Sequence, residues 1–420
     1  MTEFPVKTPT SCQLKWAWST IMLSRAKTSS CHRVGQLPLT LENFKDFHNL
    51  PKKIEDREKM LRGERPIGGC DYCFKIEDSG GISDRLNQNK FSKLAAKELL
   101  QNPHATSVTP TILEVYFNNT CNLSCLYCGS HFSSVWENEY KKYGALDNSN
   151  SLNWAHEWKN NSNSDYEQML SLFWEWMVEN SRELRKFHIL GGEPFFQPEF
   201  INCLDHFEKY PNPLCEFVII TNLMVDDKRM DYYIERLKKL VGKRKLKRLQ
   251  ITCSLDCWGP QAEYIRSGLD LQQWQRNFEK LLKLKWIRLQ INHAVNVLSI
   301  KYMPELLDKI KEWNNVRKIY LQYMTVVKPT FMNPDIFGKE LFAQDLENII
   351  QKMPDDTDFD SDIRNYFIGI SKQIGSTKPN LYEIKELKIF LEEIDRRRKT
   401  DYRVLFPWLA EIFEKIILDK

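Results

Sequence analysis

The sequence predicts an α/β protein built around a partial (β/α)6 parallel barrel. Across residues 108–330, short runs rich in Val, Ile, Tyr and Phe alternate with longer segments of helical periodicity. This alternation is typical of βαβ units in a parallel sheet. It supplies six strands, fewer than the eight of a closed barrel. We therefore expect an open barrel, with a small Cys-rich N-terminal domain at 1–107 and a helical C-terminal region at 331–420.

The six expected strands share the apolar, β-branched and aromatic composition of buried parallel strands. They are Ile112–Asn118, Lys186–Gly191, Glu216–Thr221, Arg248–Leu255, Ile287–Val295 and Lys318–Met324. Helical patterns fill the gaps, at Asp165–Arg185, Pro198–Tyr210, Asp227–Leu240, Leu271–Leu284 and Met303–Trp313. One long polar segment, His131–Ser164, separates the first strand from its helix. A segment of this length is either functional or disordered.

The two ends of the chain lack the alternation of strands and helices seen in the central region. Residues 1–107 show little periodicity outside a charged helical stretch at Leu41–Arg62. Beyond residue 330 the pattern is helical, at Gly338–Lys352, Asp360–Ile374, Tyr382–Arg398 and Phe406–Leu418. These C-terminal helices carry no recognisable chemistry, so we interpret them as a packing layer.

Composition and charge indicate a globular protein rather than a membrane or nucleic-acid-binding one. The 420 residues are 42% hydrophobic and carry a net charge of +4, which is enough for a large core and gives no reason to expect a nucleic-acid partner. No apolar run reaches the roughly 20 residues of a membrane span, and the N-terminus does not read as a signal peptide. We therefore expect a cytoplasmic protein without a membrane partner. In that compartment its eleven Cys are ligands or core residues rather than disulfides.

The first expected strand runs directly into three cysteines, Cys121, Cys125 and Cys128. Their spacing, with three and then two intervening residues, lets a tight loop direct three thiolates at one iron–sulfur cluster. Three ligands leave one iron open, as a catalytic metal site requires. The same spacing also suits a zinc knuckle with a distant fourth ligand, or buried unliganded thiols.

This loop resembles the cluster loop of the radical S-adenosylmethionine (SAM) superfamily. Tyr127 stands where that family commonly places an aromatic residue before the third cysteine. The second strand ends in Gly191-Gly192-Glu193-Pro194, similar to the family's GGEP motif. In the family this motif holds the amino group of the methionine part of SAM. A carboxylate suits an ammonium group, and glycines let backbone carbonyls approach it.

Further residues resemble the family in order along the chain. The positions that match its SAM-binding motifs are Thr221 and Asn222 of a TNG-type turn, Ser254 and Asp256 of an SLD-type signature, Arg266, and Asn296 after the fifth strand. The resemblance implies that Ser254 and Asp256 face the SAM ribose and that Arg266 pairs with the SAM carboxylate. Two positions depart from the pattern: Leu223 replaces the Gly of TNG, and Cys257 stands where relatives carry Gly.

The N-terminal cysteines form a second candidate site. Cys12, Cys31, Cys70 and Cys73 could complete a closed four-thiolate site. Their order resembles the twitch domain of one radical SAM subgroup, which implies an auxiliary iron–sulfur cluster. The other matching positions are Trp16, Trp18, Gly63-Glu64-Arg65-Pro66, Glu77, Ser83 and Arg85. A zinc ribbon remains the alternative. We interpret His32, beside Cys31, as a turn or surface histidine rather than as a substitute ligand.

Together these resemblances imply a twitch domain-containing radical SAM enzyme, with an iron–sulfur (4Fe-4S) cluster and SAM as cofactors. Such an oxidoreductase cleaves SAM reductively to a 5′-deoxyadenosyl radical, which abstracts a hydrogen from a substrate. They also imply an electron donor such as flavodoxin or ferredoxin, and a peptide or a small metabolite as substrate. The alternative class is a zinc-binding nucleic-acid or adaptor module without catalysis.

Overall fold

The computed structural model describes residues 4–78, 80, 83–91, 97–144, 146, 164–338, 341–353, 358–375 and 378–418. The protein is α/β and divides into two compact units. The first unit comprises Met1–Asn118, Asn161–Ile219 and Tyr232–Gln250. The second comprises Asn119–Asn160, Ile220–Asp231 and Ile251–Lys420. These units group residues by spatial contact, and the three domains expected from the sequence stay a prediction.

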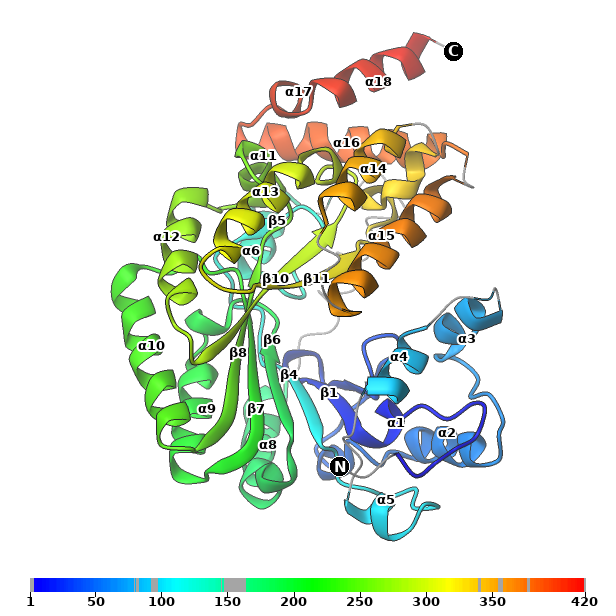
Figure 1. Ribbon diagram of the computed structural model, residues 1–420, viewed down its shortest axis with the longest axis vertical. Coiled ribbons are helices and arrows are strands. Elements are labelled where there is room, and N and C mark those ends of the chain that lie inside the picture. Colours follow the sequence, from blue (N-terminus) through cyan, green and yellow to red (C-terminus); the bar gives the residue numbers. More distant parts are fainter. Residues whose placement is uncertain are drawn as a thin grey trace. The chain divides into compact units, whose positions relative to one another are not determined.

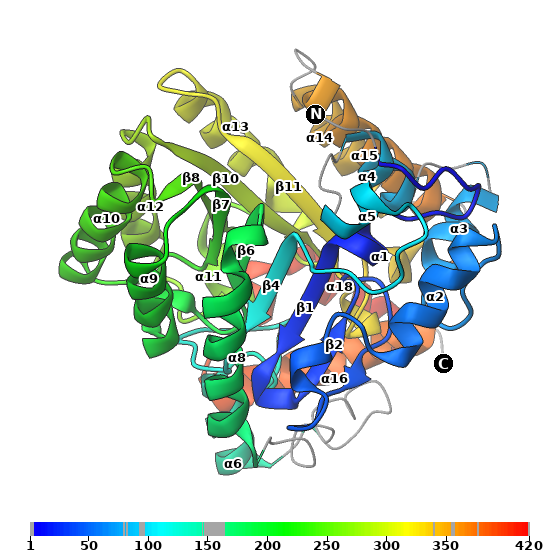
Figure 2. The ribbon, with the colours of Figure 1, turned by 90° about the horizontal axis from the view of Figure 1, so that it is seen from below.

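The first unit contains a mixed sheet with the strand order β8-β7-β6-β4-β1-β2-β3. The bounds are β1 (Trp18–Met22), β2 (Lys27–Ser29), β3 (Leu37–Pro38), β4 (Ile112–Tyr116), β6 (Lys186–Leu190), β7 (Asn212–Thr221) and β8 (Leu246–Ser254). Strand β4 pairs in parallel with both β1 and β6, and β6 pairs in parallel with β7. Strands β2 and β3 add in antiparallel pairs at the edge. Figure 2 shows β1 beside β4.

The first unit contains the helices α1 (Leu14–Ala17), α2 (Pro51–Leu61), α3 (Asp71–Asp78), α4 (Asp84–Phe91), α5 (Lys97–Gln101), α8 (Tyr166–Asn180), α9 (Pro198–Lys209) and most of α10 (Asp227–Gly242). Two of them, α8 and α9, pack aromatic side chains on the sheet. Helix α8 packs Phe173 on Phe117 after β4, and α9 packs Phe207 on Phe187 of β6. Figure 1 shows α8 and α9 against β6 and β7. Because these aromatic contacts bury large apolar areas, they anchor the strand ends that carry the candidate site.

The second unit continues from β8 into β10 (Ile287–Val295) and β11 (Tyr320–Thr325). Strands β10 and β11 pair in parallel, and a small antiparallel pair joins β5 (Ser124–Cys125) to β9 (Arg266–Ser267). Its helices are α6 (Ser134–Tyr143), α11 (Pro260–Ile265), α12 (Leu271–Leu282), α13 (Met303–Asn314), α14 (Ala343–Lys352), α15 (Asp358–Gly375), α16 (Leu381–Arg398), α17 (Tyr402–Leu405) and α18 (Pro407–Leu418). Trp274, Phe278 and Trp313 stack together between α12 and α13. This cluster ties the helices that follow β9 and β10 to one another.

The six expected strands and the helices between them are confirmed, with shifts of a few residues at their ends. The N-terminal region differs from expectation because β1, β2 and β3 extend the sheet there. The expected helix Leu41–Arg62 is wrong in its first half: α2 begins only at Pro51. A residue before proline is disfavoured in the helical region, and Leu50 has extended geometry, φ −58° and ψ 148°. Proline itself is well suited to the first helical position.

The polar segment His131–Ser164 is helical in part, because α6 covers Ser134–Tyr143. Residues 145 and 147–163 lie outside the described residues. The expected C-terminal helices are confirmed, although the first begins at Ala343 instead of Gly338. Gly338 has a φ of 70°, a left-handed conformation that does not continue into a helix. In the described ranges, no helix combines the length and the apolar character that spanning a membrane requires.

Candidate functional site

The loop that carries Cys121, Cys125 and Cys128 follows β4 and lies in the second unit. Its strand β5 pairs with β9 in a register that places Cys125 opposite Arg266. The backbone N–H of Cys128 donates to the carbonyl of Cys125 at 2.9 Å. A tight turn therefore brings the second and third cysteines together, as their close spacing predicts.

Helix α6 supports this loop from its N-terminal end. Ser133 caps the helix by accepting a hydrogen bond from the N–H of Trp136, which satisfies a backbone donor that the first turn would leave free. The Ser134 hydroxyl donates to the carbonyl of Cys121 at 3.0 Å, and the Trp136 indole donates to the carbonyl of Cys125 at 2.8 Å. The part of the polar segment that is described thus holds the cysteine loop in place.

A buried network connects the cysteine loop to residues from β8 and β9. Arg266 donates from Nη2 to Asp256 Oδ1 at 2.9 Å, and its Nη1 lies 3.8 Å from the Sγ of Cys125. The Tyr127 hydroxyl donates to Asp256 Oδ2 at 2.6 Å. The backbone N–H of Ala294 also donates to Asp256, at 2.9 Å. Asp256 is fully buried, so these three donors supply the hydrogen bonds that a buried carboxylate needs.

Burial controls the ionisation of the thiols in this loop. It raises the pKa of Cys128 to about 12, with a further increase from nearby Cys125. It also raises the pKa of Cys125, although the positive charge of Arg266 acts in the opposite direction. Both groups are therefore thiols at neutral pH in the protein alone. A metal that binds here must displace their protons, because thiolate is the ligating form.

The turn after β7 reaches the first cysteine of the loop. Asn222 Nδ2 lies 3.8 Å from the Sγ of Cys121 and donates to Asn122 Oδ1 at 2.9 Å. The next residue, Leu223, has a φ of 62°, which is a left-handed conformation that favours glycine. Its N–H donates to the hydroxyl of Thr221 at 2.9 Å. The backbone at Leu223 thus has a conformation that glycine favours, although this position carries leucine.

The Gly191–Pro194 turn belongs to the first unit. Gly191 and Gly192 have φ values of 83° and 60°, so both occupy conformations that glycine favours. A Cβ on Gly191 would lie 2.3 Å from Tyr116 Cδ1, which excludes any side chain without movement. The carbonyl of Gly191 accepts a hydrogen bond from Gln197 at 2.7 Å. Glycine is therefore required here by the packing of the turn against the end of β4.

The acidic residue of this turn is buried and starts a short helix. Glu193 is fully buried, and its Oε1 accepts a hydrogen bond from the N–H of Phe195 at 3.1 Å. Pro194 begins a 3-10 helix, Pro194–Phe196, for which Glu193 is the N-cap. A carboxylate at a helix N-terminus is stabilised by the free backbone donors there. Glu193 and Pro194 therefore have a structural role, because they begin this short helix.

Two further predicted residues lie at strand ends of the second unit. Ser254 is the last residue of β8 and is buried, whereas Asn296 directly follows β10. The Asn296 side chain accepts from the N–H of Leu298 at 3.0 Å and donates to the carbonyl of Ala294 at 2.9 Å. These bonds stabilise the turn after β10. The expected contacts of Ser254, Asp256 and Asn296 with SAM stay predictions.

The four N-terminal cysteines line a single cavity of the first unit: Cys12, Cys31, Cys70 and Cys73. Cys70 directly precedes α3, and Cys73 lies in its first turn. Burial raises the pKa of Cys12 to about 12, and the neighbouring sulfurs of Cys31 and Cys70 add to this increase. Burial likewise raises the pKa of Cys70 to about 11. The chain therefore gathers four thiols that are widely separated in sequence.

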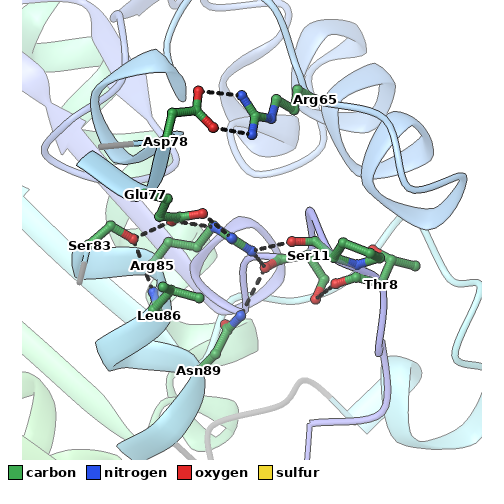
Figure 3. Close-up of polar contacts among 10 residues, drawn as sticks. Thr8, Ser11, Arg65, Glu77, Asp78, Ser83, Arg85, Leu86 and Asn89 are labelled. Atoms are coloured by element: carbon green, nitrogen blue, oxygen red, sulfur yellow. Dashed lines mark hydrogen bonds and ion pairs between the residues drawn. The ribbon is translucent and has the colours of Figure 1, made fainter. Parts of the chain in front are cut away.

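Three of the residues predicted to accompany these cysteines, Glu77, Ser83 and Arg85, bind one another (Figure 3). Arg85 Nε donates to Glu77 Oε1 at 3.0 Å, and the Ser83 hydroxyl donates to the same carboxylate oxygen. Arg85 Nη1 also donates to the carbonyl of Ser11 at 2.7 Å. Because Ser11 precedes Cys12, the segment that carries the first cysteine is fixed to α4. The resemblance that singled out Glu77, Ser83 and Arg85 thus coincides with one connected network.

Thiols are side chains of a kind that binds metals, but these thiols do not form a coordination sphere. Within the residues described, no three His, Cys, Asp or Glu side chains stand together in an arrangement that could hold a metal ion. The donor sets are nevertheless those that iron–sulfur clusters and structural zinc use: three thiols in one loop and four around one cavity. The remaining cysteines, Cys203, Cys215, Cys253 and Cys257, are fully buried.

The chain matches no protein-family model and no curated protein. Its class therefore has to be argued from its own residues.

Sequence reasoning missed a supporting residue in the C-terminal region. Arg398, at the end of α16, donates to the carbonyl of Ser124 at 3.1 Å and to Glu139 of α6 at 3.0 Å. It lies over the ring of Trp136 at 4.5 Å. The helical region expected to be only a packing layer therefore holds the strand that carries Cys125. The run of arginines at 396–398 was the signal that could have indicated this role.

Proposed function

We propose that this protein is a radical SAM enzyme with a partial (β/α)6 barrel. The observation that carries the proposal is the buried network around the three-cysteine loop. Asn222, from the turn after β7, reaches Cys121. Arg266, from β9, reaches Cys125. Both residues belong to motifs that the sequence assigns to SAM binding, and their proximity to the cysteines is independent of that assignment.

Arg266 also retains unused binding capacity. Its side chain is only 7% exposed, and within the described residues its Nε has no hydrogen-bond partner. An unpaired buried donor of this kind is unfavourable by about 1–3 kcal/mol. A carboxylate ligand would relieve this penalty and would pair with the guanidinium charge. The arrangement therefore suits the methionine carboxylate of SAM.

A 4Fe-4S cluster bound by Cys121, Cys125 and Cys128 would supply the electron that cleaves SAM to methionine and a 5′-deoxyadenosyl radical. The chain's own part is to hold its ligands and to order the site around them. Arg266 offsets the negative charge of the Cys125 thiolate, and Tyr127 and Asp256 fix the guanidinium. The four N-terminal cysteines would hold an auxiliary cluster. Flavodoxin or ferredoxin would serve as the electron donor, and a peptide or a small metabolite as the substrate.

The proposal is tested by anaerobic reconstitution with iron and sulfide, followed by a strong reductant and SAM. We expect 5′-deoxyadenosine and methionine as products, measured by chromatography and mass spectrometry. Cys125→Ala should abolish product formation because the cluster loses one of three ligands. Cys215→Ala is the matched control, since Cys215 is also a buried cysteine but belongs to β7, outside the loop.

Two outcomes would overturn the proposal. One is the absence of 5′-deoxyadenosine from reconstituted protein, and the other is full activity in Cys125→Ala. Metal analysis separates the alternative class directly, because a zinc-binding nucleic-acid or adaptor module would contain zinc and would lack iron and sulfide.

A further inference from the structure

The first unit buries more positive than negative charge beside the four-cysteine cavity. Lys15, Lys53 and Arg57 are 3%, 1% and 0% exposed. One buried carboxylate, Asp56, accompanies them and pairs with Lys15 at 2.6 Å. When all three are protonated, these three cations against the one Asp56 carboxylate leave a surplus of two positive charges. Lys52 also contacts Asp56, but its side chain is 38% exposed and solvated.

Neutral groups surround the two cations that Asp56 does not neutralise. Lys53 donates to the hydroxyls of Ser19 and Thr28 at 3.1 and 2.9 Å. Arg57 donates to the carbonyl of Lys15 at 2.7 Å and to other carbonyl and amide oxygens. Such bonds satisfy donors, but they do not balance charge. Without a counter-charge, burial lowers the pKa of Lys53 well below its usual range.

The surplus charge lies against the cysteine cavity. Lys15 lines this cavity together with Cys12, Cys31, Cys70 and Cys73. The positive charge of Lys15 acts against burial and lowers the pKa of Cys70. Lys53 donates to the carbonyl of Ser29, close in sequence to Cys31, at 3.2 Å. Lys15 is therefore the buried cation that lies beside the predicted ligands, and Lys53 and Arg57 supply the positive charge that Asp56 leaves uncompensated.

The other charged groups of this region already have partners. Arg33 pairs with Asp84 at 2.7 Å, and Arg85 pairs with Glu77. His32 lies 3.8 Å from the same Asp84 carboxylate. Glu114 accepts a hydrogen bond from the Thr20 hydroxyl at 2.9 Å. Each of these groups therefore already has a partner of its own.

A metal site with four thiolates would cancel the two surplus charges. An oxidised iron–sulfur cluster carries a core charge of about +2, so four thiolate ligands bring the site to about −2. This charge is equal and opposite to the buried surplus. Nearby positive charge also favours the reduced, more negative form of such a cluster, and thereby raises its reduction potential.

We propose that Lys15, Lys53 and Arg57 are a built-in counter-charge for an iron–sulfur cluster on Cys12, Cys31, Cys70 and Cys73, and that Lys15 sets the reduction potential of this cluster through Cys70. The inference rests on the proposed function and assigns that second cluster a redox role. Lys15 acts here as a positioning residue, through the charge it holds beside a ligand. A purely structural metal site has no need of a tuned potential.

The test is a redox titration of the full chain, in which Cys121, Cys125 and Cys128 are replaced by Ala so that the N-terminal cluster gives the whole signal. The protein is reconstituted anaerobically with iron and sulfide, and the reduced cluster is measured by electron paramagnetic resonance. We expect Lys15→Met to make reduction at least tenfold less favourable, which is a fall of about 59 mV for a one-electron couple. Lys15→Arg keeps the charge and should retain most of the potential.

Two further variants separate charge from structure. Asp56→Asn removes the buried negative charge and should raise the potential. Lys52→Met is the matched control: Lys52 contacts the same carboxylate from the same helix, but it is solvated, so the potential should stay within a fraction of that shift. If Lys15→Met fails to load a cluster, Lys53→Met removes a surplus charge without touching a cysteine and should lower the potential instead.

Unchanged potentials in Lys15→Met and Lys53→Met would overturn the inference, as would a lower potential in Asp56→Asn. Zinc in place of iron at the four cysteines would also overturn it. In either case 5′-deoxyadenosine formation by the chain with its three-cysteine loop intact would show that the proposed function survives. Loss of that activity in the otherwise unaltered chain marks failure of the proposed function instead.

Discussion

Replacement of Gly191 by alanine tests the packing of the GGEP turn against the end of β4. Two effects oppose this substitution. The residue has a φ of 83°, and the new Cβ would lie 2.3 Å from Tyr116 Cδ1. A left-handed conformation disfavours an L side chain by about 1–2 kcal/mol. Overpacking of a filled site adds about 1–3 kcal/mol. We therefore expect Gly191→Ala to lower the free energy of unfolding by about 2–5 kcal/mol.

Two other glycines of the first unit separate these contributions. Gly63 has a φ of 77°, and no atom lies within 4 Å of the position that a Cβ would take, so Gly63→Ala should cost only the conformational part, about 1–2 kcal/mol. Gly242 lies at the end of α10 with open space and no positive φ. Gly242→Ala should be neutral or stabilising by up to about 1 kcal/mol.

The assay is urea denaturation of the metal-free protein, with unfolding monitored by tryptophan fluorescence. Tyr116→Ala removes the ring atoms that the new Cβ meets, so the double variant should be less destabilised than the sum of the single variants, by about 1–3 kcal/mol. The reasoning is refuted if Gly191→Ala costs no more than Gly63→Ala. An additive double variant would equally contradict the close approach to Tyr116.

Two further predictions concern buried charge and pH. Arg266→Met leaves Asp256 without its ion-pair partner in a buried site and should destabilise the metal-free protein by about 3–5 kcal/mol. Arg248→Met breaks the 2.7 Å ion pair with Glu216, in which the arginine is 45% exposed. This variant should destabilise the protein by about 0–1 kcal/mol in the same urea assay. Equal effects of the two variants would contradict the burial argument. Burial lowers the pKa of His206 to about 4 from 6.5. The neutral imidazole is therefore favoured in the folded state, so its stabilisation is fully present above pH 6.5 and is lost as pH falls through 4, by up to about 3 kcal/mol. His206→Gln should make the free energy of unfolding less dependent on pH between pH 6.5 and 4. An unchanged pH profile would show that His206 does not cause this loss of stability.

The central part of the fold was predictable because its strands are uniformly apolar and its helices are amphipathic. Strand Ile287–Val295 was predicted with the bounds that the structure has. Strand β1 escaped prediction by periodicity, since Trp18–Met22 is short and contains two hydroxyl residues. Its pairing with β4 is a long-range contact. Local patterns carry no information about such a partner, and tertiary context decides it.

The candidate site was predictable as a set of residues but not as a set of contacts. Ordered motifs at strand ends identified the cysteines, Asn222, Asp256 and Arg266. They could not reveal that Asp256 uses both of its oxygens within the protein, on Tyr127, Arg266 and Ala294. The buried cations Lys15, Lys53 and Arg57 were invisible in the sequence, because an isolated lysine or arginine is usually exposed.

Leu223 illustrates how a departure from a motif can keep the motif's geometry. Its backbone has a φ of 62°, a conformation that is less favourable for leucine than for glycine by about 1–2 kcal/mol. Its side chain, however, is fully buried, and burial of a leucine side chain contributes about 1.5–3 kcal/mol. The two effects are of similar size, so leucine can occupy a left-handed turn here. Leucine at this position is therefore compatible with a left-handed turn that brings Asn222 to within 3.8 Å of the Cys121 sulfur.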